Sequence, residues 1–342
     1  MTILLTGFSG NVGPEMARQL LPNRVLALVR DAAQAPRRDG VTLVEGSLEA
    51  LPTAVQGEVD VIVHGAASVA FKLPLDALRR TNVEGTAALL AFARGCPRLR
   101  RFIHVSTVCV CGDRTGDIPE AAMTEARHFV NPYERSKWEA ERLVLDSGLP
   151  VEIVRLAIVA GSERDGSVRR PGALHHALYW LYKGLIPMIP GMAESRVDLI
   201  STEFAAGVVA ALVRAEAEPG RIIHASAGNA GPRLHELLDF LAEFFSRQHR
   251  GWASGAVSRP DIVDRETFAL FEKSVQQSGD LLFQRVCDDA QSFLPMLLYP
   301  RTMATSLARA VPLADWRVLA GQVAGWLIET DWNRKAKSHV PA

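Results

Sequence analysis

A tyrosine and a lysine four residues apart, Tyr133 and Lys137, are the side chains of this sequence best suited to transfer a proton. Positions i and i+4 share one face of a helix, so an ammonium at Lys137 would stand beside the phenol of Tyr133. An unperturbed phenol titrates near ~10, and a neighbouring cation favours its phenolate form. Because Tyr-x-x-x-Lys also arises by chance on surface helices, the pair indicates a catalytic site only together with other motifs.

Two hydroxyl residues, Ser106 and Thr107, end a strand-like run upstream of Tyr133. A hydroxyl at the tip of a strand can hold a carbonyl oxygen while Tyr133 gives or takes the proton, and we expect Thr107 to take this role. A serine–threonine pair can also end a strand by local hydrogen bonds alone, and we assign that role to Ser106. Asn82 lies inside a helical pattern, where asparagine is mildly unfavourable, and it either bonds the active-site backbone or faces solvent.

A glycine-rich turn near the N-terminus contains Gly7, Gly10 and Gly13, and it lies between a short apolar run and a helical pattern. In such a unit the first glycine permits a tight turn, the second lets the backbone approach a pyrophosphate, and the third lets the helix sit close to the sheet. The phosphate would meet the helix N-terminus. A glycine turn without a ligand is the alternative, but the flanking strand and helix favour a dinucleotide.

The second apolar run, residues 25–29, ends at Arg30 and Asp31. An acidic side chain at this strand tip binds the ribose 2′-hydroxyl of NAD, whereas an arginine accommodates the 2′-phosphate of NADP. Arg30 therefore favours NADP (NADPH), and NAD is the alternative if Asp31 takes the position. Arg37 and Arg38 provide either a second phosphate contact or solvated charges.

The elements that must position these residues follow from an alternation of short β-branched runs with helical patterns, notably at 75–94 and 131–147. This alternation predicts an α/β fold with a doubly wound parallel sheet of the Rossmann type. From residue 161 onward glycines and prolines interrupt an apolar stretch, which is typical of a smaller, mostly helical lobe. We expect a cofactor-binding domain at 1–160 with 197–228 returning to the sheet, and a substrate lobe at 161–196 and 229–342. The substrate would lie between them, beyond the carboxyl ends of the strands.

The composition argues against several classes of protein. Thirty-eight basic residues balance 38 acidic ones among 342, so no electrostatic case exists for a nucleic-acid partner. The four cysteines form no Cys-x-x-Cys pair or metal-ligand spacing, so we expect no metal and a reducing cytoplasm. The most apolar window, 177–193, is interrupted by a lysine and two prolines and does not predict a transmembrane helix. Since the first strand begins at Thr2, we also expect no signal peptide.

Five motifs in a fixed order resemble the extended short-chain dehydrogenase/reductase superfamily. They are Thr6-Gly-x-x-Gly-x-x-Gly13, Asn82-Val-Glu-Gly-Thr86, Ser106-Thr107, Tyr133-x-x-x-Lys137 and Arg155. Three further strings resemble the branch of this superfamily that holds fatty acyl-CoA reductases and thioester reductase domains, with male-sterility-type NAD binding. They are His64-Gly-Ala-Ala67, the string from Asn131 to Arg142, and Val197-Asp-Leu-Ile200. The resemblance covers about residues 2–228, and Gly46-Ser47 departs from it where glycine-aspartate usually approaches the adenine.

The resemblance implies roles for the site residues. Tyr133 would be the acid, Lys137 would lower its pKa and bind the nicotinamide ribose, and Thr107 would orient the substrate oxygen. In many family members the helices at 75–94 and 131–147 form a dimer surface, so a homodimer is one expectation. Contacts to the cofactor are expected from Gly7, Ser9, Gly10, Asn11, Val12, Gly13, Arg30, Ala66, Asn82 and Lys137.

We therefore expect an NADPH-dependent oxidoreductase that reduces a thioester or carbonyl of an apolar acyl or polyketide-like substrate to an aldehyde or alcohol. The substrate would be a small molecule, free or delivered on CoA or a carrier protein, whose phosphates or acidic surface could meet a charge run at 164–170. An alcohol dehydrogenase or ketone reductase of the sterol-dehydrogenase type, and an NADP-binding redox sensor, are the alternatives. The apolar second half offers no obvious set of residues for the diphosphate of a nucleotide sugar. The expected pocket lining is the stretch 179–192 with Phe268, Leu270 and Phe271, or with Leu281, Leu282 and Phe283.

Overall fold

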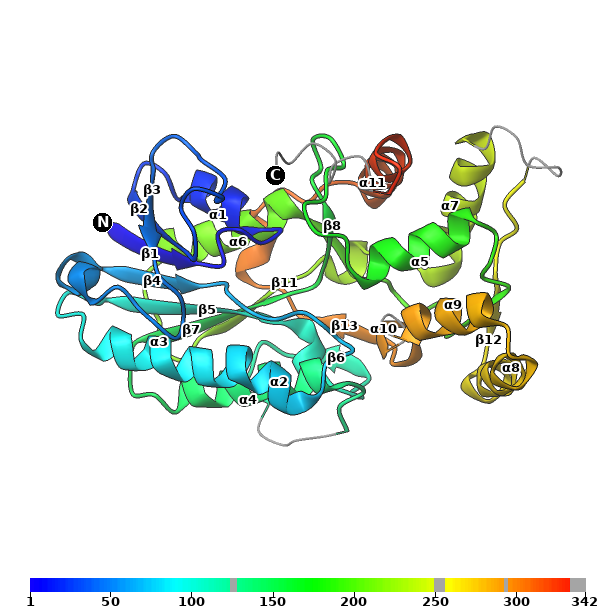
Figure 1. Ribbon diagram of the computed structural model, residues 1–342, viewed down its shortest axis with the longest axis horizontal. Coiled ribbons are helices and arrows are strands. Elements are labelled where there is room, and N and C mark those ends of the chain that lie inside the picture. The colour runs from blue at the N-terminus through cyan, green and yellow to red at the C-terminus, as the bar shows by residue number, and fades with distance from the viewer. Residues whose placement is uncertain (124–127, 249–255, 292–294, 333–342) are drawn as a thin grey trace.

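Seven parallel strands form the central sheet of the computed structural model, which describes residues 1–123, 128–248, 256–291 and 295–332 (Figure 1). The strand order reverses between β1 and β4, and in sheets of this type the ligand crevice lies at the carboxyl ends of the strands at such a point. The doubly wound Rossmann sheet expected from the sequence is confirmed. Across the sheet the strands are β11 (Ile222–Ala225), β7 (Val151–Leu156), β5 (Arg101–Thr107), β4 (Val61–His64), β1 (Thr2–Thr6), β2 (Arg24–Val29) and β3 (Val41–Glu45).

Helices cover both faces of this sheet (Figure 1). On one face α1 (Gly13–Leu20) packs against α6 (Thr202–Arg214), and on the other lie α2 (Leu75–Arg79), α3 (Gly85–Arg94) and α4 (Pro132–Leu145). Successive strand residues point to opposite faces, so Ile3 joins the core beneath α1 and α6 whereas Leu4 joins the core beneath α3. The sheet is therefore packed between two apolar layers, one on each face.

A π-helical turn, Arg80–Glu84, joins α2 and α3 inside the helix expected at 75–94. Such turns are rare and are found frequently at functional sites. Asn82 lies in this turn and is 1% exposed. The extra residue in the turn accommodates a buried polar side chain that a regular helix disfavours.

Beyond the carboxyl ends of the strands lies a mostly helical lobe with its own apolar core (Figure 1). The expected return of 197–228 to the sheet occurs through β11 alone, and the expectation is wrong for β10 (Leu199–Ser201). The reason is that β8 (Ile158–Gly161) starts just after β7, leaves the sheet and takes β10 as its partner. The lobe helices are α5 (Ala173–Tyr182), α7 (Leu234–Gln248), α8 (Arg265–Ser278), α9 (Leu281–Gln291), α10 (Pro295–Leu298) and α11 (Trp316–Glu329).

Short elements complete the described chain. Two further strand pairs are β9 (Met188–Pro190) with β12 (Asp261–Val263), and β6 (Gly116–Ile118) with β13 (Arg301–Met303). Short 3-10 helices lie at Thr53–Glu58, Val108–Cys111, Gly228–Ala230 and Leu307–Ala310. None of the helices in the described ranges has the length and apolar character needed to cross a membrane. The cysteines Cys96, Cys109, Cys111 and Cys287 are buried free thiols.

Candidate active site

Helix α4 begins at the end of β5 because its first residues supply their own cap. The side-chain oxygen of Asn131 accepts a hydrogen bond from Glu134 N at 3.0 Å, and Pro132 occupies the first helical turn, where its missing N–H costs nothing. The Glu134 carboxylate reaches back to Val130 N at 3.0 Å. This reciprocal cap fixes the position of Tyr133, the second residue of the helix.

The phenol of Tyr133 is buried and hydrogen-bonded to Thr107, the last residue of β5. Burial raises the pKa of this phenol above its ordinary value of 10, and the hydrogen bond from Thr107 offsets only part of that effect. The phenol therefore holds its proton at neutral pH. This burial opposes the lowered pKa that the spacing of Tyr133 and Lys137 predicts.

Lys137 explains the difference, because its ammonium contacts the end of β5. Its Nζ donates to Val105 O at 3.0 Å and lies 3.3 Å from His104 Nε2. Burial lowers the pKa of Lys137 to about 8, with Glu141 acting in the opposite direction. Desolvation therefore outweighs the attraction that the i, i+4 spacing suggested, and it opposes charge on both groups.

Asn82 connects the active-site helix to the loop that follows β4. Its Oδ1 accepts from Ser68 N at 2.7 Å, and its Nδ2 donates to Ser68 O at 3.0 Å and to Ser136 Oγ at 2.9 Å. Ser136 Oγ in turn donates to Tyr133 O at 2.8 Å. Of the two alternatives left by the sequence, bonding to the active-site backbone is the one observed.

Phe71, on the same loop, packs its ring edge-on against Tyr133, with ring centroids 4.8 Å apart. This contact excludes water from one side of the phenol. Sequence reasoning missed Phe71; the signal available was an aromatic residue shortly after the His64-Gly-Ala-Ala67 string. Next to it, Lys72 forms an ion pair with Asp289 of α9 at 2.8 Å, so the loop also contacts the helical lobe.

Thr107, and not Ser106, makes the local hydrogen bond expected at the end of this strand. Thr107 Oγ1 accepts from Cys109 N at 3.2 Å and caps the 3-10 turn, whereas Ser106 Oγ is buried without a hydrogen-bond partner in the described part of the chain. The expectation that Ser106 ends the strand by local hydrogen bonds is therefore wrong. The side chain alternation of β5 places successive residues on opposite faces, so only one of the two reaches the turn.

A cavity of about 440 Å³ opens at the carboxyl ends of β1, β2 and β4, and its geometry fits a dinucleotide. Gly7 has φ +80°, and a Cβ there would lie 2.4 Å from Gly65 C; a Cβ at Gly13 would lie 2.3 Å from Gly7 O. A Cβ at Gly10 would meet Gly7 O alone, at 3.1 Å, and would otherwise stand in open space. The first and third glycines thus serve packing, and the second keeps the approach to the backbone bare.

The structure separates the expected cofactor residues into groups. Val12 and Gly13 begin α1, and Asn11 bonds the backbone of Arg170 rather than lining this cavity. Asn82 bonds Ser136 of α4, and Lys137 bonds the end of β5. Arg170, which the sequence suggested for a carrier or CoA, lines this cavity as well. Among the expected residues, those lining it are Gly7, Ser9, Gly10, Arg30 and Ala66.

A second cavity, about 340 Å³, lies beside α1 and is lined by Arg38 and Arg169 among others. Arg164, also in its wall, pairs with Glu15 at 2.7 Å and with Glu203 at 2.9 Å. The three arginines expected to meet a carrier or CoA therefore do not form one surface. Arg164 is in ion pairs, Arg169 lines the second cavity and Arg170 lines the dinucleotide cavity.

A third cavity, about 60 Å³ and apolar, lies within the helical lobe. Leu270, Leu281 and Leu282, which we expected in a substrate pocket, are 68%, 79% and 46% exposed, because they occupy the outer faces of α8 and α9. The stretch 179–192 contributes to this cavity as expected. Its wall is formed by Leu174, Ala177, Leu178, Leu181, Ile186, Met188, Ile189, Pro190, Leu234, Leu237, Leu238, Leu241, Phe268 and Leu297.

Comparison with known proteins shows what this chain is similar to. Residues 46–209 match the family model described as male sterility protein. The chain is 30% identical over 187 residues to a hybrid PKS-NRPS synthetase of Penicillium oxalicum, covering 47% of this chain and 4% of that protein. It is 33% identical over 174 residues to the 4-hydroxy-2-methyl-3-oxo-4-farnesyl-3,4-dihydroquinoline-1-oxide ketoreductase of Stigmatella aurantiaca, covering 48% of this chain and 52% of that protein.

Among solved structures, the terminal R domain from the myxalamid PKS-NRPS biosynthetic pathway matches with a TM-score of 0.75 and 22% identity, covering 97% of this chain and 91% of that chain. This likeness shows a shared fold. The chain spans about half the length of the curated ketoreductase and a small fraction of the synthetase.

Proposed function

We propose that this chain is an NAD(P)H-dependent oxidoreductase of the extended short-chain dehydrogenase/reductase type, and that it reduces a thioester or carbonyl of an apolar acyl or polyketide-like substrate with NADPH. The match of residues 46–209 to the male sterility family model supports this proposal. The observation that carries this proposal is the buried pair Thr107 and Tyr133, whose side chains share a hydrogen bond at the carboxyl end of β5. Two adjacent hydroxyl donors suit a single substrate oxygen on which negative charge develops.

In the proposed reaction, bound NADPH supplies the hydride that the substrate carbon receives. Thr107 and Tyr133 hold the substrate oxygen, and Tyr133 then donates its proton to it. The raised pKa of Tyr133 keeps this proton on the phenol until charge develops. With a thioester substrate, the product of this step is a hemithioacetal, which collapses to an aldehyde and a free thiol.

The preference for NADPH is supported by the different contacts of Arg30 and Asp31. Asp31 Oδ1 accepts from Ala33 N at 2.8 Å and from Gln34 N at 3.2 Å, so its carboxylate closes its own turn. Arg30 lines the dinucleotide cavity. Since an arginine at this strand tip accommodates a 2′-phosphate, Arg30 is the residue that we assign to the cofactor choice.

The apolar character of the substrate is supported by the cavity in the helical lobe, whose lining residues are all apolar. We assign the cofactor to residues 1–160 with β11, and the substrate to the helical lobe. A substrate of this kind would arrive on CoA or a carrier protein, or as a free carbonyl compound. The match to a curated ketoreductase favours ketone reduction as the second candidate function.

The first test follows the absorbance of NADPH with purified protein, offering a medium-chain acyl-CoA in one sample and the matching aldehyde or ketone in another. Oxidation of NADPH by the acyl-CoA supports thioester reduction. Oxidation only by the carbonyl compound assigns the protein to the ketone reductases. Tight binding of NADPH with no oxidation in either sample means either that the enzyme needs a carrier-bound substrate or that the protein is a redox sensor.

Substitution of Tyr133 by Phe distinguishes an enzyme from a sensor. We expect kcat to fall by about 10²- to 10⁴-fold, since the acid is removed, while the Kd for NADPH stays within about twofold. Tyr299→Phe, in the helical lobe, is the matched control and should keep full activity. Turnover by Tyr133→Phe at the wild-type rate would exclude Tyr133 as the acid.

A further inference from the structure

The loop from Ser162 to Gly172 crosses from the helical lobe to the glycine turn. Its Arg170 lines the dinucleotide cavity together with Ser9 and Gly10. The side-chain amide of Asn11 holds both backbone groups of Arg170: Nδ2 donates to Arg170 O at 2.9 Å, and Oδ1 accepts from Arg170 N at 2.8 Å. The glycine turn and this loop, 159 residues apart along the chain, are thus joined at the cavity wall.

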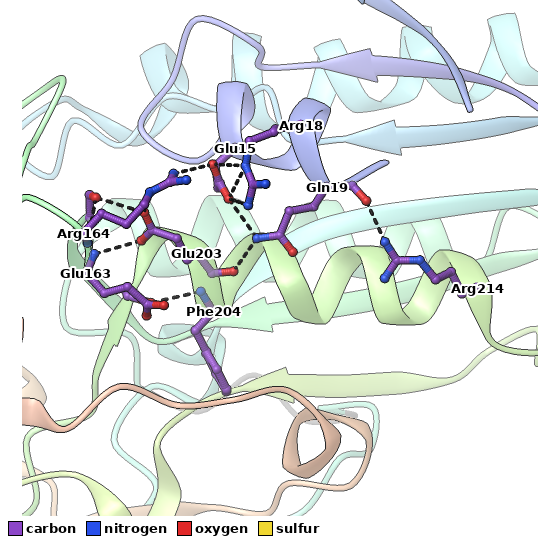
Figure 2. A network of polar contacts seen from close by, with 10 residues as sticks. Glu15, Arg18, Gln19, Glu163, Arg164, Glu203, Phe204 and Arg214 are labelled. Carbon is purple, nitrogen blue, oxygen red and sulfur yellow. Dashed lines mark hydrogen bonds and ion pairs between the residues drawn. The ribbon is translucent and has the colours of Figure 1, made fainter. Parts of the chain in front are cut away.

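Arg164 fixes the other end of the same loop. Figure 2 shows Arg164 reaching both Glu15 of α1 and Glu203 of α6, with Nη2–Oε2 at 2.7 Å and Nε–Oε1 at 2.9 Å. The Glu203 carboxylate also accepts from Ser162 Oγ and from Glu163 N, each at 2.9 Å. The loop is therefore attached to α1 and α6 near its start and to the glycine turn at Arg170.

The two carboxylates in this network are buried, with Glu15 4% and Glu203 8% exposed. Burial acts to raise the pKa of Glu15, but hydrogen bonds from Arg18, Gln19 and Arg164 lower it to about 2. Glu15 is therefore charged at neutral pH and needs its cationic partners. The middle of the loop packs against α11: a Cβ at Gly166 would lie only 2.1 Å from Gln322 O, so the two backbones are in close contact.

We propose that this loop is a phosphate clamp, in which Arg170 binds the pyrophosphate of the nicotinamide dinucleotide and Arg164 is a positioning residue. The inference rests on the proposed function only in that a dinucleotide occupies the cavity. A guanidinium presents paired donors that match phosphate oxygens, and Arg170 lines the cavity together with Ser9 and Gly10 of the turn that meets the pyrophosphate. Arg30, at the tip of β2, serves the ribose end of the same cavity.

The experiment measures the Kd of NADPH and of NADH by isothermal titration with Arg170→Gln, Arg30→Gln and the wild type. A pyrophosphate is common to both dinucleotides, so Arg170→Gln should weaken both by about tenfold and leave their ratio unchanged, whereas Arg30→Gln should weaken NADPH alone. Arg169→Gln is the matched control, because Arg169 lines the other cavity, and it should bind both like the wild type.

Wild-type affinity of Arg170→Gln for both dinucleotides would overturn the clamp while leaving the proposed function intact. So would a loss confined to NADPH, which would place Arg170 at the 2′-phosphate. A titration with CoA tests the other phosphate source: a loss of CoA binding with unchanged dinucleotide binding also overturns the clamp. Failure of the wild type to bind either dinucleotide overturns both the clamp and the proposed function.

The positioning role of Arg164 is tested by a double-mutant cycle on the same Kd values. If Arg164 acts through Arg170, Arg164→Gln weakens dinucleotide binding in the wild type but has almost no further effect in Arg170→Gln. A purely structural role would give the same fold-loss in both backgrounds and would overturn this part of the proposal. Thermal unfolding of each variant confirms that the comparison is made between folded proteins.

Discussion

At the scale of single residues, burial decides the charge of the two groups that the sequence pairs. Tyr133 and Lys137 are 8% and 2% exposed, and burial raises the pKa of the phenol and lowers that of the ammonium. Both shifts favour the neutral form of the group, and only that of Lys137 brings its pKa nearer to neutral pH. Tyr133 therefore starts as the proton donor that a reductase needs, and Lys137 titrates close to neutral pH.

The buried ammonium of Lys137 costs stability that a neutral side chain would not. Its pKa falls from 10.5 to about 8, and at about 1.4 kcal/mol per unit Lys137→Met should raise the free energy of unfolding of the cofactor-free protein at pH 7 by up to about 3 kcal/mol. This loss of stability is fully present below pH 8 and disappears as the pH rises toward 10.5. The difference in unfolding free energy between Lys137→Met and the wild type should therefore narrow between pH 8 and 10.5.

Urea unfolding at neutral and alkaline pH measures this gap, and activity should be lost in the same variant. Lys273→Met, at an exposed position on α8, is the control and should change stability by less than about 0.5 kcal/mol. A less stable Lys137→Met at neutral pH would contradict the assignment of a costly buried charge.

At the scale of elements, the loop from residue 65 to residue 74 connects three parts of the site. It lines the dinucleotide cavity at Ala66, bonds Asn82 through Ser68, and covers Tyr133 with Phe71. Through Lys72 it also reaches α9 of the helical lobe. The π turn that carries Asn82 is therefore the element that holds this loop against α4.

Asn82→Ala tests this role of the π turn. Loss of the amide leaves Ser68 N and O without their partner and removes the bond to Ser136 Oγ, so the free energy of unfolding should fall by about 2 to 4 kcal/mol. Glu84→Ala, an exposed position in the same turn, should stay within about 0.5 kcal/mol of the wild type. Chemical denaturation of both variants makes the measurement, and equal stability of the two would remove Asn82 from this role.

At the scale of the whole molecule, the sheet and the helical lobe have separate apolar cores. One core lies between the sheet and α1 with α6, a second lies beneath α3, and α5, α7 and α11 with parts of α9 and α10 form the core of the lobe. The polar site lies on the sheet side, and the apolar cavity lies inside the lobe. This division suits a substrate with a reactive polar end and an apolar body.

Narrowing the lobe cavity should select against long substrates. Ala177→Phe adds a ring to the cavity wall, so kcat/KM for the longest acyl chains that the wild type accepts should fall about tenfold or more, with short chains unchanged. The same substitution at the exposed neighbour His176 is the control and should leave the chain-length profile as it is. An equal loss for short and long chains would mean that the cavity does not hold the chain.

The sequence by itself determined the features that depend on neighbours along the chain. The strand, glycine turn and helix at the N-terminus, the alternation of strands with crossover helices, and the start of α4 just before Tyr133 were all predictable from local patterns. Glycine turns, helix caps and β-branched strands depend on interactions between residues that are close in the sequence, so the sequence alone predicts them.

Only the tertiary structure decided the features that depend on burial and distant contacts. The raised pKa of Tyr133 and the lowered pKa of Lys137 follow from desolvation by residues far along the chain. Arg170 reaches the dinucleotide cavity through Asn11, 159 residues away, and β10 pairs with β8 outside the sheet. Free energies of desolvation and of such long-range pairing depend on which surfaces meet, and a one-dimensional pattern does not contain that information.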